Sequence, residues 1–137
     1  MRFRSFAVLL GIAALLAPNA AKTGTIPAQE PRYDPETVVT LSATVLELRE
    51  VPKGGILSGL HLIVDTDKDS DLDVYIAPMH YLKELQISYA KGDRLEIKGS
   101  KVKTTAGTVV LVREVRRDAD TGYFRDAGGK PYWNPGS

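Results

Sequence analysis

Five aspartates alternate along the segment DTDKDSDLD, at positions 65, 67, 69, 71 and 73. Alternating carboxylates in a loop present the hard oxygen ligands that calcium prefers. The EF-hand pattern would need glycine at Ser70 and glutamate at Ile76, and the sequence has neither. Two interpretations stay open. One is a solvated hairpin tip whose charges prevent edge-to-edge strand pairing; the other is a calcium site formed by Asp65, Asp67, Asp69 and Asp71.

His61 and the pair Met79-His80 are the candidates for binding a softer metal. Imidazole and thioether groups suit copper. The whole chain has two His and two Met, one of them the initiator, which is too few ligands for a convincing copper site. We expect His80 instead to cap or pack at the start of a helix. The chain has no Cys, which excludes disulfides, thiolate-bound metals, a thiol nucleophile and haem attached through C-x-x-C-H.

Basic residues concentrate between residues 81 and 117, where nine bases accompany four acids. A basic groove with aromatic side chains would suit single-stranded nucleic acid. The neighbouring strands offer only Tyr75 for stacking, and the aspartate segment would repel phosphate, so the sequence argues against nucleic acid. The alternatives are a strand edge protected by lysines or a docking face for an anionic partner. The basic face would comprise Lys98, Lys101, Lys103 and Arg113.

Catalytic chemistry finds little support in the chain. Its serines, among them Ser42, Ser58 and Ser100, do not lie in the surroundings of a nucleophile elbow. The paired aspartates lie on a segment that we expect to be exposed, whereas acid–base catalysis usually needs a pKa shifted by burial. We therefore expect a binding protein, not an enzyme.

Four aromatic residues gather near the C-terminus, in the segment GYFRDAGGKPYW. Two of them precede the Gly-Gly turn and two follow it. Such a concentration either forms a structural clasp that caps the domain or forms a surface that binds a partner. Trp, Tyr and Arg dominate the energetics of interfaces, which supports the second interpretation. The candidate partner-binding residues are Tyr123, Phe124, Arg125, Tyr132 and Trp133.

Alternating apolar residues predict the strands that must position these groups. In the first strand the apolar residues change from odd to even positions near Val45–Leu46. This change predicts a bulge or a sharp bend. In the third we expect Leu72, Val74 and Ile76 to face inward and Asp73 and Tyr75 outward. The predicted strands cover residues 38–51, 59–66, 71–78, 94–103 and 107–117, with one short helix over 79–88.

Five strands with a helix between the third and the fourth follow the order of the OB-fold, a five-stranded Greek-key barrel. The predicted fold class is therefore all-β with one short helix, and a generic β-sandwich is the alternative. A chain of 137 residues with 43% apolar composition suits one domain. We place the barrel at residues 37–118 and the aromatic extension, a hairpin or clasp packed on the barrel, at residues 119–137.

The N-terminus has the layout of a secretory signal peptide. Arg2 and Arg4 precede an apolar stretch over residues 6–17, and small residues follow at Ala20 and Ala21. The stretch is short for a membrane span, which needs about 20 apolar residues, although an uncleaved anchor is the alternative. We expect residues 1–20 to be removed and residues 21–36 to form a flexible linker. The mature protein would then be periplasmic or secreted, with no membrane span.

Several short segments occur in an order shared with a known family. YDPE at 33–36 precedes the first strand, GLHL at 59–62 opens the second, and KGD at 91–93 precedes the fourth. FRD at 124–126 and GKPYW at 129–133 follow the last. In this order the chain resembles the exported OB-fold domain of the magnetosome MamS and MamX proteins, and more distantly the periplasmic bacterial OB-fold family.

The resemblance implies an exported OB barrel and implies no enzymatic activity. MamX-like members carry haem through C-x-x-C-H motifs, which this chain lacks. We therefore expect a module without a cofactor that binds an envelope protein. The alternatives are a barrel that binds a small ligand or an ion, and then one that binds nucleic acid or an oligosaccharide.

Overall fold

A computed structural model describes residues 30–133 of the chain. The predicted signal peptide and most of the predicted linker lie outside these residues. Within the described part, no helix is long and apolar enough to cross a membrane. The elements are η3 (Pro35–Thr37), β1 (Val38–Val51), β2 (Gly59–Asp65), β3 (Leu72–Ala77), α1 (Met79–Leu85), β4 (Arg94–Thr104), β5 (Gly107–Arg117) and β6 (Asp120–Tyr123).

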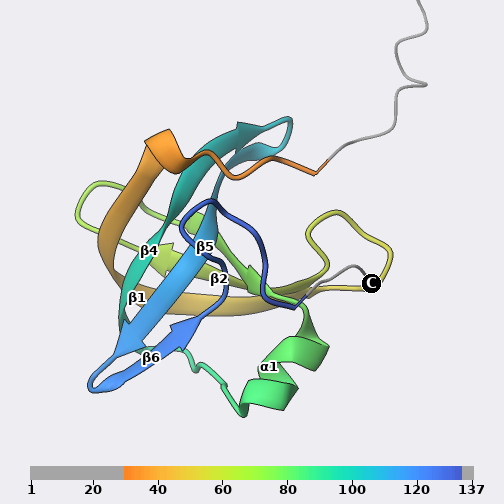
Figure 1. Ribbon diagram of the computed structural model, residues 1–137. Coiled ribbons are helices and arrows are strands. Elements are labelled where there is room, and N and C mark those ends of the chain that lie inside the picture. The colour runs from red at the N-terminus through yellow and green to blue at the C-terminus, as the bar shows by residue number, and fades with distance from the viewer. Residues whose placement is uncertain (1–29, 134–137) are drawn as a thin grey trace, which may run out of the picture.

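The strands form one sheet in the order β3-β2-β1-β4-β5-β6, and a parallel pairing of β3 with β5 closes five of them into a barrel. All other neighbouring pairs are antiparallel. In Figure 1, α1 lies below the barrel, and the C-terminal segment, in dark blue, runs back across the front of it. The molecule is therefore the predicted OB-fold barrel with one additional strand, β6.

The long strand β1 serves both halves of the barrel because it bends in the middle. Residues 38–44 pair with β4, and residues 44–51 pair with β2. The register of the second pairing shifts between Val45 and Glu47, which confirms the bulge predicted from the parity change. The shift turns the second half of β1 without removing Val45 from the core, where it is 1% exposed.

Alternate residues of all five barrel strands fill the interior, as the apolar pattern predicts. Leu82 closes the lower end, and it is the buried residue of α1. The strand residues with no exposed area in this core are Leu62, Val64, Val74, Ile76, Ala77, Ile97, Val110 and Val112.

Helix α1 ends at Leu85, three residues before the predicted end. Gln86 adopts a left-handed conformation (φ 56°, ψ 42°), and the Ile87 N–H donates to Leu82 O at 3.0 Å. This closure stops the helix and turns Ile87 toward β6, where its Cδ1 lies over Gly122. At the other end Pro78 occupies the N-cap position, so His80 does not cap the helix and is exposed.

Candidate functional site

The C-terminal tail is anchored at an irregularity in β5. Lys98 pairs with Glu114 and Gly99 with Val112, so Arg113 has no partner on β4. The carbonyl oxygen of Arg113 instead accepts the N–H groups of Phe124 (2.8 Å) and Arg125 (3.2 Å). These two bonds carry the chain from β6 back toward the barrel.

A tight loop then returns the tail across the barrel. The Asp126 carboxylate accepts the N–H groups of Gly128 and Lys130, both at 2.9 Å, and these backbone bonds lower the pKa of Asp126. Gly129 has φ +97°, and a Cβ at this position would lie 2.4 Å from the ring of Tyr33. Only glycine fits a turn of this shape against that ring. The Tyr132 N–H completes the loop by donating to Phe124 O at 3.1 Å.

Neighbouring aromatic residues of the tail consequently lie in different environments. Phe124 is fully buried and meets Tyr81 edge-on, with ring centroids 6.3 Å apart. Trp133 is partly buried and packs against the core. Tyr123 and Tyr132 are 56% and 53% exposed. The predicted partner-binding set is thus divided, because Phe124 and Trp133 anchor the tail and only the two tyrosines offer a large surface.

The two exposed tyrosines border a groove of about 490 Å³ between α1 and β6. Tyr81, Leu85 and Ile87 supply its other apolar lining, and Leu85 is 38% exposed. We name these five residues, Tyr81, Leu85, Ile87, Tyr123 and Tyr132, the aromatic groove. The sequence placed Tyr81, Leu85 and Ile87 only within the predicted helix over residues 79–88, because nothing in the pattern places β6 beside α1.

Ordered polar contacts hold the rim of the aromatic groove. The Arg117 guanidinium donates to Asp93 Oδ2 at 2.7 Å and to Ser88 O at 3.0 Å, and it lies 5.2 Å from the ring centre of Tyr89. Backbone bonding at Ala90, followed by the contact with Arg117, lowers the pKa of Asp93. These contacts fix the linker from α1 to β4 beside β6, so the groove is preformed.

A second aromatic surface lies on the outer face of β2, β3 and β5. Tyr75 points outward from β3 as predicted, yet it is only 4% exposed. The side chains of Leu57, Tyr33 and Trp133 pack over this face, and the Tyr75 hydroxyl donates to Ser58 O at 2.8 Å. Burial raises the pKa of Tyr75. We name this surface the covered face.

The covered face corresponds to the surface on which OB-folds usually bind oligonucleotides and oligosaccharides, namely strands 2 and 3 with the adjoining loops. Here the chain itself occupies it. The sequence predicted a flexible linker up to residue 36. The structure instead packs Tyr33 beneath the tail and joins the Asp34 N–H to the buried Ser100 hydroxyl at 3.0 Å.

Arg125 belongs to this covering layer and does not extend toward solvent. Its guanidinium lies 5.2 Å from the ring centre of Trp133 and 5.9 Å from that of Tyr33, and it donates to Gly129 O at 3.0 Å. Burial lowers the pKa of the guanidinium. Within the described residues its Nε atom has no hydrogen-bond partner. Arg125 thus holds the tail by cation–π contacts.

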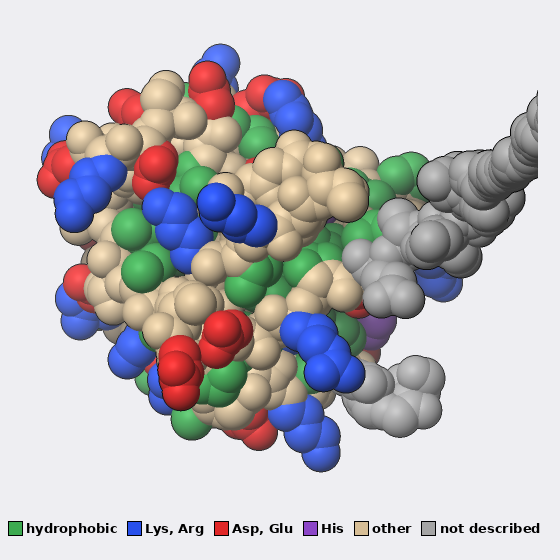
Figure 2. Space-filling view, turned by 90° about the horizontal axis from the view of Figure 1, so that it is seen from above, with side chains coloured by type: hydrophobic (Ala, Val, Ile, Leu, Met, Phe, Trp, Pro, Cys, Tyr) green, Lys and Arg blue, Asp and Glu red, His purple; other side chains and the backbone are tan. Residues whose placement is uncertain are grey.

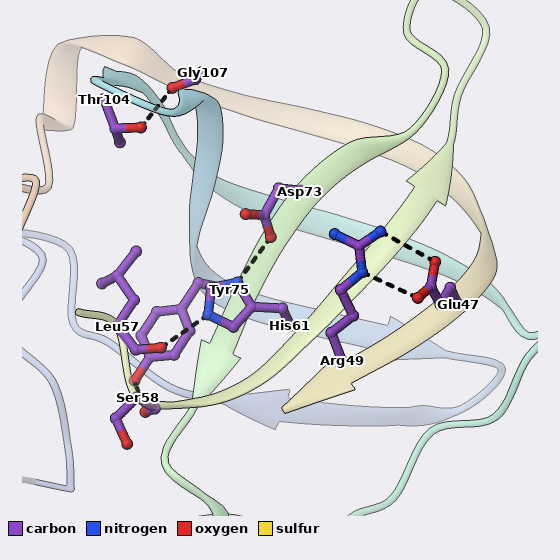
Figure 3. A network of polar contacts seen from close by, with 9 residues as sticks. All are labelled: Glu47, Arg49, Leu57, Ser58, His61, Asp73, Tyr75, Thr104 and Gly107. Atoms are coloured by element: carbon purple, nitrogen blue, oxygen red, sulfur yellow. Dashed lines mark hydrogen bonds and ion pairs between the residues drawn. The ribbon is translucent and has the colours of Figure 1, made fainter. Parts of the chain in front are cut away.

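His61 lies at the edge of the covered face and bonds to two acceptors (Figure 3). Its Nδ1 is 2.8 Å from Asp73 Oδ1, and its Nε2 is 2.8 Å from Leu57 O. Beside Asp73 runs a groove of about 630 Å³ toward the β4–β5 turn, which Glu47 and Arg49 also line. Because both nitrogens of His61 are engaged, the ring offers no free lone pair to a metal such as copper.

The aspartates proposed for calcium are dispersed. Asp65 and Asp67 line a separate groove with Arg94 and Arg116, whereas Asp69 forms an ion pair with Lys101 at 2.9 Å. Asp71 is exposed in a left-handed turn conformation, with φ 55°. In residues 30–133, no three acidic or histidine side chains lie close enough together to hold a metal ion. The structure therefore gives the predicted calcium site no support.

The basic residues of β4 and β5 do not share a face. Lys98 lies on the opposite side of β4 from Lys101 and Lys103, because side chains alternate along a strand. Arg113 lies at the irregularity of β5. Seen from above, Lys and Arg side chains are interspersed with Asp and Glu side chains (Figure 2). The structure does not gather the predicted set into one basic surface.

Comparison with known proteins gives one match. The model of the MamS/MamX magnetosome protein family matches residues 37–121, which covers the whole barrel and the start of β6. No curated protein and no solved structure matches the chain.

Proposed function

The chain belongs to the MamS/MamX magnetosome protein family, and we propose that it is an exported accessory protein that acts by binding a partner protein rather than by catalysis. The observation that carries the proposal is the aromatic groove. It combines two half-exposed tyrosines and an exposed leucine on a rigid frame. Exposed aromatic side chains grouped around a preformed groove are typical of interface hot spots.

The partner that fits this groove is an extended protein segment with apolar side chains. β6 is the last strand in the sheet order, and among the described residues it pairs with β5 alone. An edge strand of this kind accepts a further strand through backbone hydrogen bonds. A partner strand beside β6 would direct alternate side chains toward Tyr81, Leu85 and Tyr123.

The polar clusters on the molecule favour binding over catalysis. Among the described residues, the imidazole of His61 bonds to two acceptors, Asp73 Oδ1 and Leu57 O. Lys101, Arg116 and Arg117 each form an ion pair with a carboxylate. These groups are engaged in structural contacts, so the groove with uncommitted apolar surface is the better candidate site.

The proposal is tested by site-specific photocrosslinking in the native cell envelope. The photoreactive residue p-benzoylphenylalanine replaces Tyr132 or Leu85 within the groove. The matched control replaces Ile56, an apolar residue with a similar exposure of 41% on the loop after β1. We expect one protein to crosslink from both groove positions and not from Ile56.

Binding of that purified protein then decides the proposal. Loss of a hot-spot side chain costs about 2 kcal/mol of binding free energy. Tyr123→Ala and Tyr132→Ala should therefore each raise the Kd on the order of 30-fold. Tyr132→Phe keeps the ring and should stay close to the wild-type Kd. Equal crosslinking from Ile56, or an unchanged Kd in both alanine variants, would reject the groove as the docking site.

Export is tested separately. The arginines and the apolar stretch of residues 1–21 support cleavage after Ala20 or Ala21. We expect the chain in the periplasmic or secreted fraction, with a mature N-terminus at Ala21 or Lys22 by mass spectrometry. An intact Met1 in the cytoplasmic fraction would contradict this part of the proposal.

A further inference from the structure

The two bonds of His61 require its ring to be charged. Neutral imidazole carries one N–H and one lone pair. Here both nitrogens face atoms that only accept, the Asp73 carboxylate and the Leu57 carbonyl, each at 2.8 Å. Both bonds form together only when Nδ1 and Nε2 are both protonated. Below the raised pKa of His61, the imidazolium therefore joins β3 to the loop over residues 52–58.

Charged and aromatic groups from several elements surround the ring of His61. Asp73 contacts the ring from β3, Arg49 faces it from β1, and Tyr75 lies at 5.0 Å between ring centres. Burial and Arg49 lower the pKa of His61, but the bonds to Asp73 and Leu57 outweigh them, so the pKa is raised. Across the loop, Glu30 accepts the Leu57 N–H at 3.2 Å. Nearby Val109 and Leu111 of β5 carry no charge.

The loop over residues 52–58 depends on few contacts. Leu57 packs on the covered face, Ser58 O accepts the Tyr75 hydroxyl, and Leu57 O accepts His61. Leu57 also has φ 52°, a left-handed conformation that is unfavourable for a residue with a branched side chain. The bond from His61 to Leu57 O is thus one of the contacts that hold this strained backbone in place.

We propose that residues 52–58 form a proton-controlled latch on the covered face, which the His61 imidazolium holds closed and which opens when Nε2 loses its proton. The charge-assisted bond to Asp73 retains the proton on Nδ1, so Nε2 is the atom that is deprotonated. Its lone pair then faces the lone pairs of Leu57 O. The bond becomes a repulsion, and the loop leaves Tyr75.

Opening has a defined structural consequence. The groove beside Asp73, lined by Ile63 and Val109 among others, ends close to the area that Leu57 covers. With the loop released, this groove would extend onto the ring of Tyr75. The surface that OB-folds use for ligands would then become accessible. The inference is independent of the aromatic groove, which lies on α1 and β6.

The test combines NMR titration of the His61 ring with hydrogen exchange of the loop amides. At low pH both ring nitrogens should be protonated. A raised pKa in the closed state means that the stabilisation is complete below about pH 6.5 and is lost as the pH rises to the raised pKa. Protection factors of residues 54–58 should therefore fall by up to about tenfold per pH unit in that interval, and level off above it.

Two variants sharpen the test. Asp73→Asn removes the carboxylate that retains the proton, so loss of protection should occur at a lower pH than in the wild type. Asp71→Asn is the matched control, because Asp71 lines the same groove without bonding to His61. His80→Gln removes the exposed histidine of the described part and should leave the pH dependence unchanged.

Three results would overturn the proposal. His61 could titrate at or below about 6.5, the ordinary value for histidine. Protection of residues 54–58 could stay constant while Nε2 is deprotonated. Asp73→Asn could behave like Asp71→Asn. The titration and the hydrogen exchange of the wild-type protein alone decide the first two results. The proposal therefore stays falsifiable even if a variant fails to fold.

Discussion

The aromatic groove and the covered face are both built from aromatic side chains, but they differ in what lies over them. In the groove, Tyr123 and Tyr132 keep more than half of their surface exposed. On the covered face, Tyr75 is 4% exposed beneath Leu57, Tyr33 and Trp133. One tail segment contributes to both surfaces, since Tyr132 borders the groove and the next residue, Trp133, packs on the covered face.

The difference shows how the segments that flank a barrel can cover the usual ligand surface of its fold. The outer face of β2 and β3 is the usual ligand surface of an OB-fold. In this chain, side chains from the residues before β1 and after β6 cover that surface. The same tail adds β6 beside α1 and so creates an exposed groove elsewhere. The same short segment thus buries Phe124 and most of Trp133 and leaves Tyr123 and Tyr132 exposed.

The largest effect is expected from removing the anchor that both surfaces share. Phe124→Ala empties a fully buried site in the core and should lower the free energy of unfolding by about 3–5 kcal/mol. Chemical denaturation measures this change. A loss below about 1 kcal/mol would mean that the tail does not depend on this ring, and the comparison between the two surfaces would fail.

A smaller loss of stability is expected from a substitution that disturbs the covered face. Gly129→Ala places a Cβ 2.4 Å from the ring of Tyr33 at φ +97°, and such crowding costs about 1–3 kcal/mol. Gly128→Ala is the matched control, because its Cβ would lie 3.6 Å from the nearest atom, Asp126 Oδ1. We expect Gly129→Ala to raise hydrogen exchange around the covered face. Equal thermal melts for the two variants would contradict this packing.

Alkaline pH should destabilise the fold progressively. Burial raises the pKa of Tyr75, and it raises that of Tyr89 to about 12. Unfolded tyrosine ionises near pH 10, so the unfolded state binds fewer protons above that value and stability falls as the pH rises. Each buried tyrosine contributes up to about 1.4 kcal/mol per pH unit. Tyr75→Phe should therefore reduce the slope of unfolding free energy against pH between 10 and about 12; an unchanged slope would contradict burial of this hydroxyl.

The smallest effect on stability is expected in the aromatic groove. Tyr123→Ala and Tyr132→Ala remove side chains that are more than half exposed, so unfolding free energy should change by no more than about 0.5 kcal/mol. Thermal and chemical denaturation check this expectation. A large loss of stability would show that these tyrosines are structural, and the contrast with Phe124 would disappear.

Much of the barrel could be predicted because its signals are local. Alternation of apolar residues gave the extents of β1 and β5, and a parity change located the bulge near Val45. The aspartate segment shows the limit of such reasoning. Five carboxylates alternate within a short stretch of sequence. In the folded hairpin, however, Asp69 pairs with Lys101 and Asp73 bonds to His61.

The amino-acid sequence by itself determined the fold class, the order of the five barrel strands and the helix along the chain, and the presence of an aromatic tail, since each follows from periodicity and composition. Tertiary structure alone decided which aromatic residues are exposed. The carbonyl of Arg113 is available to Phe124 only because β5 is irregular opposite β4. His61 links β3 to the loop over residues 52–58 only because Leu57 O and Asp73 approach it from separate segments. Such contacts depend on strand register and on chain reversal, which no local pattern encodes.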